Sequence, residues 1–404
     1  MDLPAQPPAA PFAARPSPDG NLYPNGTIFP NSSILVVTIV AGVMGFLLSL
    51  ILLKQFLPQL CHALKVRYQS KRSQVLLELQ TESQALHVMV DGQLQPLYDA
   101  FEALLARVAP SPERFQGSLR ALVTGAPVDA ARGLGWYMGV PDAELYRSMA
   151  QGVAAIEREV NTHGTDVDRE CLEYVLHAAA GSSPLIFPNS PYPRDCDENG
   201  TVPSRLKETG EGMVLQDFVN HPNAQHAGLT VAHVLAVRLY STAAFRSLND
   251  PLRQRSQPHP VSSTIAILAD ALRRLRSVEA LADSAQQPVD LWRGMAQMGA
   301  VADSFEREGG TELAPMSTTS ELSVAFSYAA SAQALLFKIA SSSFMDRGAD
   351  ISWLSAFPGE REYLFPPLTY LRPTGRHEEL RLRHPTQGYV IGVRVVEVSA
   401  SFGS

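Results

Sequence analysis

The sequence predicts an α+β fold for the second half of the chain. Two apolar stretches with helical periodicity come first, at Leu229–Leu248 and Thr264–Leu281. After residue 290, short runs rich in apolar and aromatic residues predict strands, namely LWRGM, PMSTTS, ALLFKIA, EYLFPPLTYL and YVIGVRVVEV. Helices followed by strands are typical of α+β domains, and we place this domain at residues 209–404.

Length and composition limit the classes of protein that fit. The 404 residues are enough for two or three domains, and 45% hydrophobic residues can bury a sizeable core. A net charge of -7 argues against a nucleic-acid partner, because nucleic-acid binders usually present a basic surface. Three cysteines, Cys61, Cys171 and Cys196, are too few and too scattered for a disulfide framework.

An uncharged apolar run predicts a single transmembrane helix at residues 34–53. As a helix this run is about 30 Å long, which matches the hydrocarbon core of a bilayer, so membrane lipid is an expected partner. The preceding residues 1–33 are rich in proline and have little that could pack, so we expect them to be disordered.

Charge beside the apolar run predicts the orientation of the chain in the membrane. Residues 54–72 hold five basic side chains and no acid, whereas Arg15 is the only base before the run. Positive charge resists translocation, so we expect the C-terminal domain to be cytosolic. The sequons at Asn25 and Asn31 agree with this topology, and a glycan on Asn199 would reverse it.

The middle of the chain predicts a helical region and a linker. Residues 54–180 comprise a basic juxtamembrane segment and helices, in which Leu97, Phe101 and Leu104 share one face. We find no chemistry there and expect an ordinary helical spacer or bundle. Residues 181–208 are rich in proline and turn formers, which indicates a linker or a long surface loop with Cys196 exposed.

Three local patterns in the C-terminal half are candidates for chemistry. Arg293 lies inside an apolar strand, where an unpaired charge is costly. A hydroxyl-rich run, residues 317–320, precedes a helix-like stretch, and Glu360 and Glu362 lie two apart before a strand, where i and i+2 side chains share a face. Alone, each has an ordinary interpretation: an edge-strand arginine, a helix cap and a solvated strand face. The spacing of His221, His226 and His233 predicts no metal site.

Together, these patterns resemble the arginine, serine-threonine-serine and glutamate-x-glutamate motifs of the arginine-directed mono-ADP-ribosyltransferases. Ser317 follows Arg293 by 24 residues, and Glu362 follows Ser317 by 45. The upstream YSTAAFRSLNDPLR, from Tyr240 to Arg253, is similar to a helix of the same family. The resemblance implies a split β-sandwich with an N-terminal helical lobe, and NAD as co-substrate without a metal.

The resemblance also implies roles for individual residues. Glu362 would stabilise the oxocarbenium-like transition state of NAD cleavage, and Ser317 would orient Glu362. Arg293 would bind the NAD phosphates, and the backbone of Gly294 would approach the nicotinamide amide. The remaining positions implied in NAD binding are Thr318, Thr319 (where the family most often has serine) and Phe326, which could equally be a core residue.

Glu360 is the residue that the resemblance links to the acceptor. A carboxylate here would pair with an acceptor arginine and take its proton, and Phe357 and Trp353 would contact the acceptor protein. The leading prediction is therefore a membrane-anchored NAD:protein-arginine mono-ADP-ribosyltransferase. Two alternatives stay open, a NAD glycohydrolase and an inactive NAD-binding or scaffold domain held at a membrane.

Overall fold

The computed structural model describes residues 86–90, 93–105, 128, 132–182, 194–196, 201–204, 212–280, 283–296, 303–330, 333–383 and 390–402. Gln84–Ser404 form one compact unit. The predicted disordered segment 1–33, the predicted membrane helix 34–53 and the basic stretch 54–72 lie outside the described residues. Within the described ranges, no helix is both long and apolar enough to cross a bilayer.

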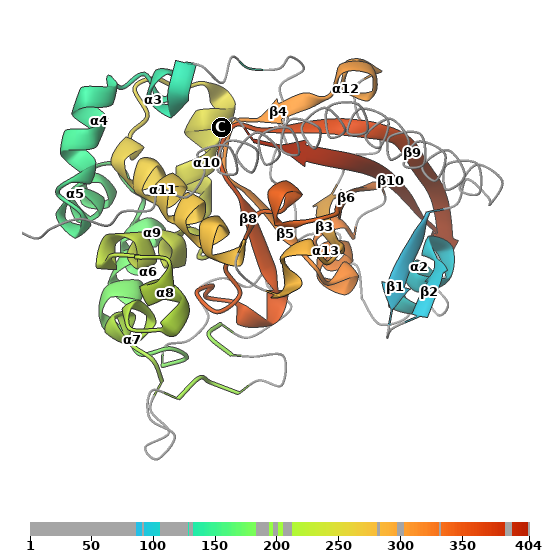
Figure 1. Ribbon diagram of the computed structural model, residues 1–404, viewed down its shortest axis with the longest axis horizontal. Helices are drawn as coiled ribbons and strands as arrows, with labels where there is room; N and C mark the ends of the chain where they lie inside the picture. The colour runs from blue at the N-terminus through green and yellow to red at the C-terminus, as the bar shows by residue number, and fades with distance from the viewer. Residues whose placement is uncertain are drawn as a thin grey trace, which may run out of the picture. The chain divides into compact units, whose positions relative to one another are not determined.

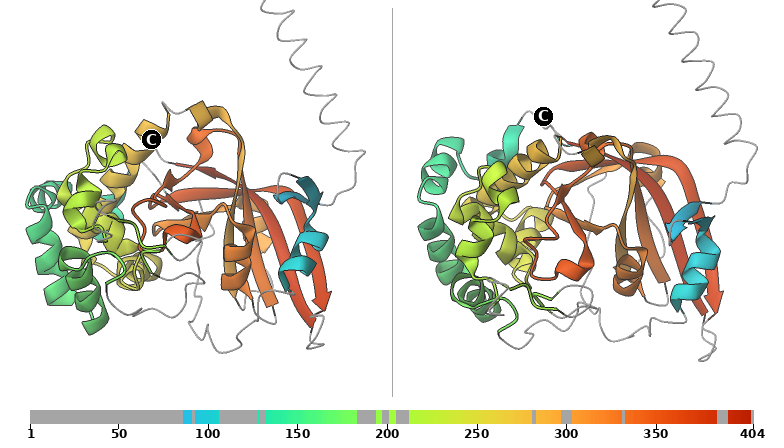
Figure 2. Two further views of the ribbon diagram at one scale, coloured as in Figure 1. Left: turned by 90° about the horizontal axis from the view of Figure 1, so that it is seen from below. Right: turned by 60° about the horizontal axis from the view of Figure 1, so that its bottom comes forward.

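Most of the helices gather at one side of the compact unit, and the strands lie at the other side with the remaining helices (Figure 1, Figure 2). We call the helices α3 to α11 the helical lobe. They are α3 (Gly133–Met138), α4 (Asp142–Met149), α5 (Val153–His163), α6 (Asp166–His177), α7 (Leu215–Val219), α8 (Pro222–His226), α9 (Val231–Tyr240), α10 (Phe245–Gln254) and α11 (Ser262–Glu279). All residues of α9 after Val231 are buried, because the other helices surround it.

The helical lobe crosses the predicted domain boundary. Helices α5 and α6 precede the predicted linker at residues 181–208, yet they pack with α9 and α11 in one apolar core. The domain predicted to begin at residue 209 therefore shares its apolar core with helices that precede the predicted linker. The physical reason is that the apolar faces of the helices on both sides of the linker are buried against each other.

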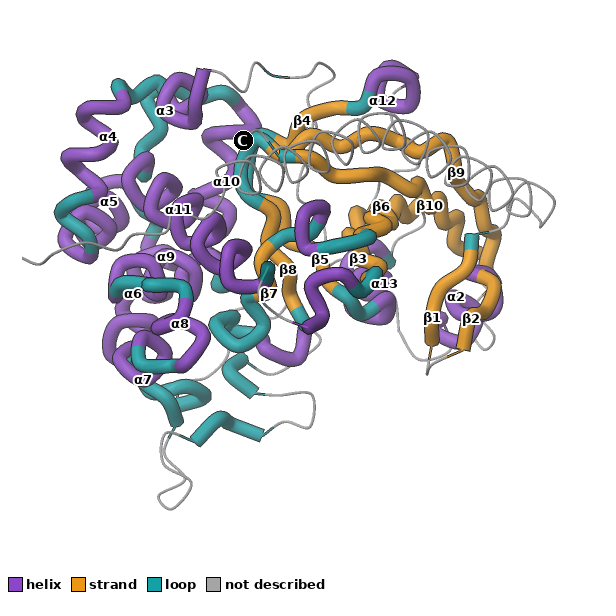
Figure 3. Tube along the Cα trace, viewed as in Figure 1, coloured by secondary structure: helices purple, strands orange, loops and turns teal. Residues whose placement is uncertain are grey.

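Apart from one hairpin, the strands in the described part of the chain form one eight-stranded sheet (Figure 3). Its order is β4-β9-β10-β6-β3-β5-β8-β7, and β10 and β6 are the parallel neighbours. The bounds are β3 (Val289–Ala296), β4 (Gly310–Glu312), β5 (Met316–Thr319), β6 (Gln333–Ser341), β7 (Ala349–Asp350), β8 (Glu362–Phe365), β9 (Thr369–Arg383) and β10 (Val390–Ser401). Every run predicted as a strand contains one, so the predicted α+β class is confirmed.

Two apolar cores cover the two faces of the long strands. On one face, α13 (Leu322–Ala329) and α2 (Leu97–Leu105) pack with Trp292 and with apolar residues of β6, β9 and β10. On the other face, Phe305 of α12 (Asp303–Glu308) stacks on Phe337 with the ring centroids 5.4 Å apart. The neighbouring residues Leu291 and Trp292 of β3 are both buried, one in each core, as expected of a strand covered on both faces.

Hydrogen bonds connect all eight strands of the sheet, but two neighbouring strands, β3 and β5, are joined by a single residue pair. Strand β3 pairs with β6 along its whole length, whereas it pairs with β5 through Trp292 and Thr319 alone. We call this place the β3/β5 seam. The split β-sandwich implied by the resemblance is therefore present as a single sheet that nearly divides at this seam.

Three further expectations are corrected. The predicted helical region contains a hairpin, β1 (His87–Val90) and β2 (Gln93–Pro96), before α2. The stretch Leu229–Leu248 is not one helix, because α9 ends at Tyr240 and α10 begins at Phe245. Cys196 is 8% exposed rather than on the surface, since Arg194–Cys196 pass through the interior of the unit.

Candidate active site

Glu362 is a buried carboxylate at the first position of β8. It is 6% exposed, and Ser355 Oγ donates a hydrogen bond of 3.1 Å to its Oε2. The pKa of Glu362 is raised to about 7, because burial and the neighbouring carboxylate of Glu360 raise it by more than the hydrogen bonds from Ser317 and Ser355 lower it. The carboxyl group is thus held in place by two hydroxyls and titrates near neutral pH.

Arg293, Ser317 and Glu362, which are far apart in sequence, come together around this carboxylate. Arg293 Nη1 donates to the backbone oxygen of Ser317 over 2.8 Å, and the Ser317 side chain hydrogen-bonds Glu362. Burial and the neighbouring cation of Arg253 lower the pKa of Arg293, so an anionic ligand beside its guanidinium would be stabilising. The structure therefore brings the three predicted residues into one site.

The pKa of Tyr240 also shows that Glu362 and Arg293 lie close together. Burial raises its pKa to about 12, Glu362 contributes to the rise, and Arg293 lowers the pKa. The hydroxyl donates to the backbone oxygen of Pro315 over 3.0 Å and accepts from Asn249 Nδ2 over 3.1 Å. The upstream motif that begins at Tyr240 thus lies beside the carboxylate and the arginine.

Glu360 lies close to Glu362 but not on the same strand face. It ends the 3-10 turn η4 (Pro358–Glu360), and Arg361 between the two carboxylates has a positive φ of 47°. The expectation of two carboxylates on one face of an extended strand is therefore wrong, because the chain turns at Arg361. Tyr328 on α13 donates a hydrogen bond of 2.7 Å to Glu360 Oε1.

The two threonines of β5 fasten the glutamate segment to the sheet. Thr318 Oγ1 donates to the backbone oxygen of Tyr363 over 2.8 Å, and Thr319 Oγ1 donates to that of Glu360 over 2.6 Å. Thr319 Oγ1 also accepts from the backbone N–H of Glu321, which precedes α13. Their hydroxyls are thus occupied in holding Glu360 and Glu362 beside β5, in addition to any contact with a ligand.

Gly294 lies against α13, and Phe326 is part of that helix. A Cβ on Gly294 would lie 1.8 Å from the backbone oxygen of Ala325, so α13 packs directly on this glycine. Phe326 is fully buried, and its ring lies 5.2 Å from that of Phe101 on α2. The structure places Phe326 in the core between two helices, where its ring has no surface for a nicotinamide.

The two aromatic residues predicted to contact the acceptor differ from that expectation. Trp353 stacks on His221 of the helical lobe, with the ring centroids 4.3 Å apart, and Phe357 is 6% exposed. Both belong to residues 351–361, between β7 and β8, which we call the acceptor loop. In this conformation, neither ring is free on the surface to meet an incoming protein.

Two residues of the site were not predicted from the sequence. Ser355 binds Glu362 from the acceptor loop, and Tyr328 binds Glu360 from α13. Ser355 lies two residues before the predicted Phe357, and Tyr328 two residues after Phe326. A hydroxyl side chain this close to a predicted motif could have suggested a role in the site, but only the fold shows which residue each hydroxyl contacts.

The family model described as "ART: NAD:arginine ADP-ribosyltransferase" matches residues 216–384. This match confirms, for residues 216–384, the resemblance to ADP-ribosyltransferases that the motifs predicted. No curated protein matches the chain significantly.

Several solved structures are similar to this chain. The eucaryotic mono-ADP-ribosyltransferase ART2.2 has 13% identity, covers 70% of this chain and 94% of its own, and gives a TM-score of 0.34. HopU1 of Pseudomonas syringae has 19% identity, with 58% and 97% covered and a TM-score of 0.33. Plx2a from Paenibacillus larvae has 17% identity, with 46% and 94% covered and a TM-score of 0.32.

Proposed function

We propose that this protein is a membrane-anchored NAD:protein-arginine mono-ADP-ribosyltransferase. The observation that carries the proposal is the buried Glu362, held by Ser317 and Ser355, with Glu360 close by and Arg293 bound to the Ser317 backbone. The family match supports NAD as the co-substrate. Arginine as the acceptor rests on the glutamate at position 360.

The proposed reaction replaces one bond to the ribose of NAD by another. The bond between the nicotinamide nitrogen and ribose C1′ breaks, and nicotinamide leaves with the electron pair. Positive charge develops on the ribose, and ionised Glu362 stabilises it from its fixed position. An acceptor guanidinium nitrogen forms the new bond to C1′ while its proton passes to Glu360.

Replacement of each glutamate separates the two parts of this proposal. We expect Glu362→Gln to lower nicotinamide release by roughly 10²–10⁴-fold, because the charge that stabilises the transition state is removed. We expect Glu360→Gln to lose transfer to an arginine acceptor while it keeps hydrolysis of NAD. Nicotinamide release with and without an arginine acceptor measures both quantities.

Glu321→Gln is the matched control, because Glu321 is a partly exposed carboxylate that pairs with Arg361 beside the same loop. It should leave both rates close to those of the wild type. A Glu362→Gln variant as active as the wild type would refute the assignment. Hydrolysis without transfer in the wild type would instead support the NAD glycohydrolase alternative.

Membrane anchoring is a separate part of the proposal and rests on the sequence. The uncharged run at residues 34–53 and the basic side chains after it support a single span with the transferase domain in the cytosol. Alkaline extraction of membranes and protease protection test the span and its orientation. A glycan found on Asn199 would contradict the orientation.

A further inference from the structure

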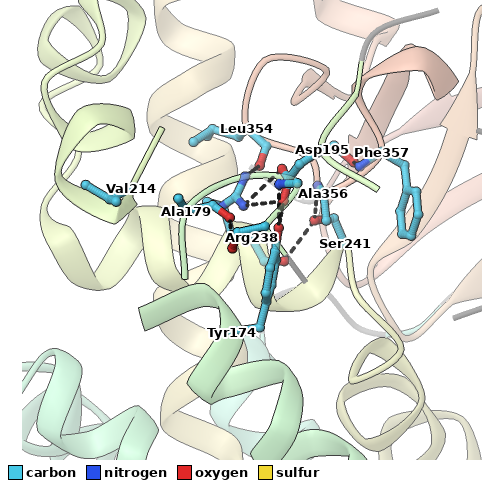
Figure 4. A network of polar contacts seen from close by, with 12 residues as sticks. Tyr174, Ala179, Asp195, Val214, Arg238, Ser241, Leu354, Ala356 and Phe357 are labelled. Atoms are coloured by element: carbon cyan, nitrogen blue, oxygen red, sulfur yellow. Dashed lines mark hydrogen bonds and ion pairs between the residues drawn. The ribbon is translucent and has the colours of Figure 1, made fainter. Parts of the chain in front are cut away.

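The described middle of the Pro-rich segment is built into the interior beside the acceptor loop. Arg194 and Asp195 are 3% and 1% exposed, and Figure 4 shows Asp195 between the helical lobe and the loop residues Leu354 and Ala356. A linker or surface loop would leave such side chains in water. Burial of charged residues indicates that this segment has specific partners.

Asp195 is held by two helices of the helical lobe. Arg238 Nη2, from α9, lies 3.1 Å from Asp195 Oδ1 and 3.2 Å from Oδ2, and Tyr174 of α6 donates its hydroxyl hydrogen to Oδ2. The Arg238 and Asp195 side chains are only 3% and 2% exposed. Since water does not screen this ion pair, each charge depends on the other.

The same two residues hold the acceptor loop on both sides of Ser355. Arg238 Nη1 donates to the backbone oxygen of Leu354 over 3.0 Å, and the backbone N–H of Asp195 donates to that of Ala356 (Figure 4). The N–H of Ala356 in turn donates to Ser241 Oγ over 2.8 Å, just after α9. Ser355, between these two anchored residues, is the one whose hydroxyl binds Glu362.

We infer that Asp195 and Arg238 are positioning residues, which hold the acceptor loop so that Ser355 keeps the Glu362 carboxylate in its reactive orientation. The inference rests on the proposed function, since it concerns the geometry of the same site. Removal of one charge leaves the other buried without its partner, and the loop backbone then loses its anchors. A displacement of about 1 Å at a reacting group can cost about 100-fold in rate.

Asp195→Asn tests this inference against Glu159→Gln. Glu159 is also a buried carboxylate, and it accepts hydrogen bonds from Ser263 and Thr264 in the helical lobe at 2.7 to 2.9 Å, with no described contact to the acceptor loop. Both variants should lower the unfolding temperature. Only Asp195→Asn should speed amide hydrogen exchange within residues 351–361, by roughly tenfold or more.

Kinetics provide the second readout. Asp195→Asn should lower kcat for nicotinamide release by roughly 10- to 100-fold, while KM for NAD stays close to that of the wild type because Arg293 is untouched. Glu159→Gln should leave both constants unchanged. If Asp195→Asn fails to fold, Tyr174→Phe removes one hydrogen bond to Asp195 and keeps the ion pair, and a smaller change of the same kind is expected.

The two readouts separate the two proposals. Loop exchange in Asp195→Asn equal to that of the wild type overturns the positioning inference, whatever the activity. Equal kcat losses in Asp195→Asn and Glu159→Gln also overturn it, since general destabilisation then explains both. A wild-type protein that neither cleaves NAD nor transfers ADP-ribose overturns the proposed function, while the exchange measurement still decides whether Asp195 anchors the loop.

Discussion

At the scale of single residues, Glu362 is a buried carboxylate to which we assign a catalytic role. The proposed reaction needs the ionised carboxylate, yet burial raises the pKa of Glu362 to about 7. The folded protein therefore binds this proton more tightly than the unfolded chain, in which a glutamate titrates near 4.3. The stability that Glu362 contributes is complete below about pH 4.3 and is lost as the pH rises through about 7.

Two pH dependences follow from Glu362. Nicotinamide release should rise with pH around a midpoint near 7, because the carboxylate forms there. The stability of Glu362→Gln relative to the wild type should increase between about pH 4 and 7. Glu279, whose pKa burial also raises to about 7, is present in both proteins and cancels in the comparison. A release profile without a midpoint near neutral pH would contradict this account.

The residues of the site were predictable from sequence where a motif names them. Arg293, Ser317 and Glu362 were, because ordered spacing carries information about a family even when each motif alone has an ordinary explanation. Ser355 and Tyr328 were not, since a lone hydroxyl side chain has no sequence pattern and its partner depends on the turn of the chain.

At the scale of elements, the contact between β3 and α13 accounts for Gly294. The resemblance attributes this glycine to NAD binding, but the packing of Ala325 leaves no room for any side chain there, with or without a ligand. Loss of activity on its replacement would therefore not by itself demonstrate contact with nicotinamide.

Gly294→Ala should destabilise the protein. Its Cβ meets the backbone oxygen of Ala325, which can move only with the whole helix α13, and overpacking of this kind costs about 1–3 kcal/mol or more. Chemical denaturation measures the change. The control is Gly133→Ala, where φ is positive but no atom lies within 4 Å, so strain of about 1 kcal/mol is expected. Equal losses in both variants would show that α13 does not restrict position 294.

Strands were predicted more accurately than helix limits. Runs such as ALLFKIA are apolar on both faces because two cores cover the sheet, so the strand signal is strong. The single predicted helix at Leu229–Leu248 failed because its apolar residues continue through the turn between α9 and α10. Periodicity alone does not show a turn in which residues such as Thr242 and Ala244 are themselves buried.

At the scale of the whole compact unit, a buried ion pair joins the helical lobe to the sheet. Arg253 of α10 binds Glu312 of β4 through two hydrogen bonds of 3.1 Å, and the Glu312 side chain is 1% exposed. The sequence did not predict this contact, because the partners are 59 residues apart and neither lies in a recognisable pattern with the other. For the same reason, sequence composition does not reveal that helices on both sides of residue 209 share a core.

Glu312→Gln should destabilise the folded unit by about 3–5 kcal/mol, because Arg253 would remain buried without a counter-charge. Asp166→Asn, which removes an exposed ion pair with Arg169, is the control and should cost under about 1 kcal/mol. Chemical denaturation of the two variants measures both changes in the free energy of unfolding. Equal, small losses would mean that water reaches the Arg253–Glu312 pair.

The β3/β5 seam has a consequence for how the site can fail. One ladder pair, Trp292 with Thr319, aligns the half of the sheet that carries Arg293 with the half that carries Glu362. A slip of one residue there would shift the cation by about 3.3 Å and turn it to the opposite face. The hydrogen bond from Arg293 to the Ser317 backbone therefore helps to hold the two strands in the correct register. The proposed site can therefore form only when the two half-sheets pair in the correct register.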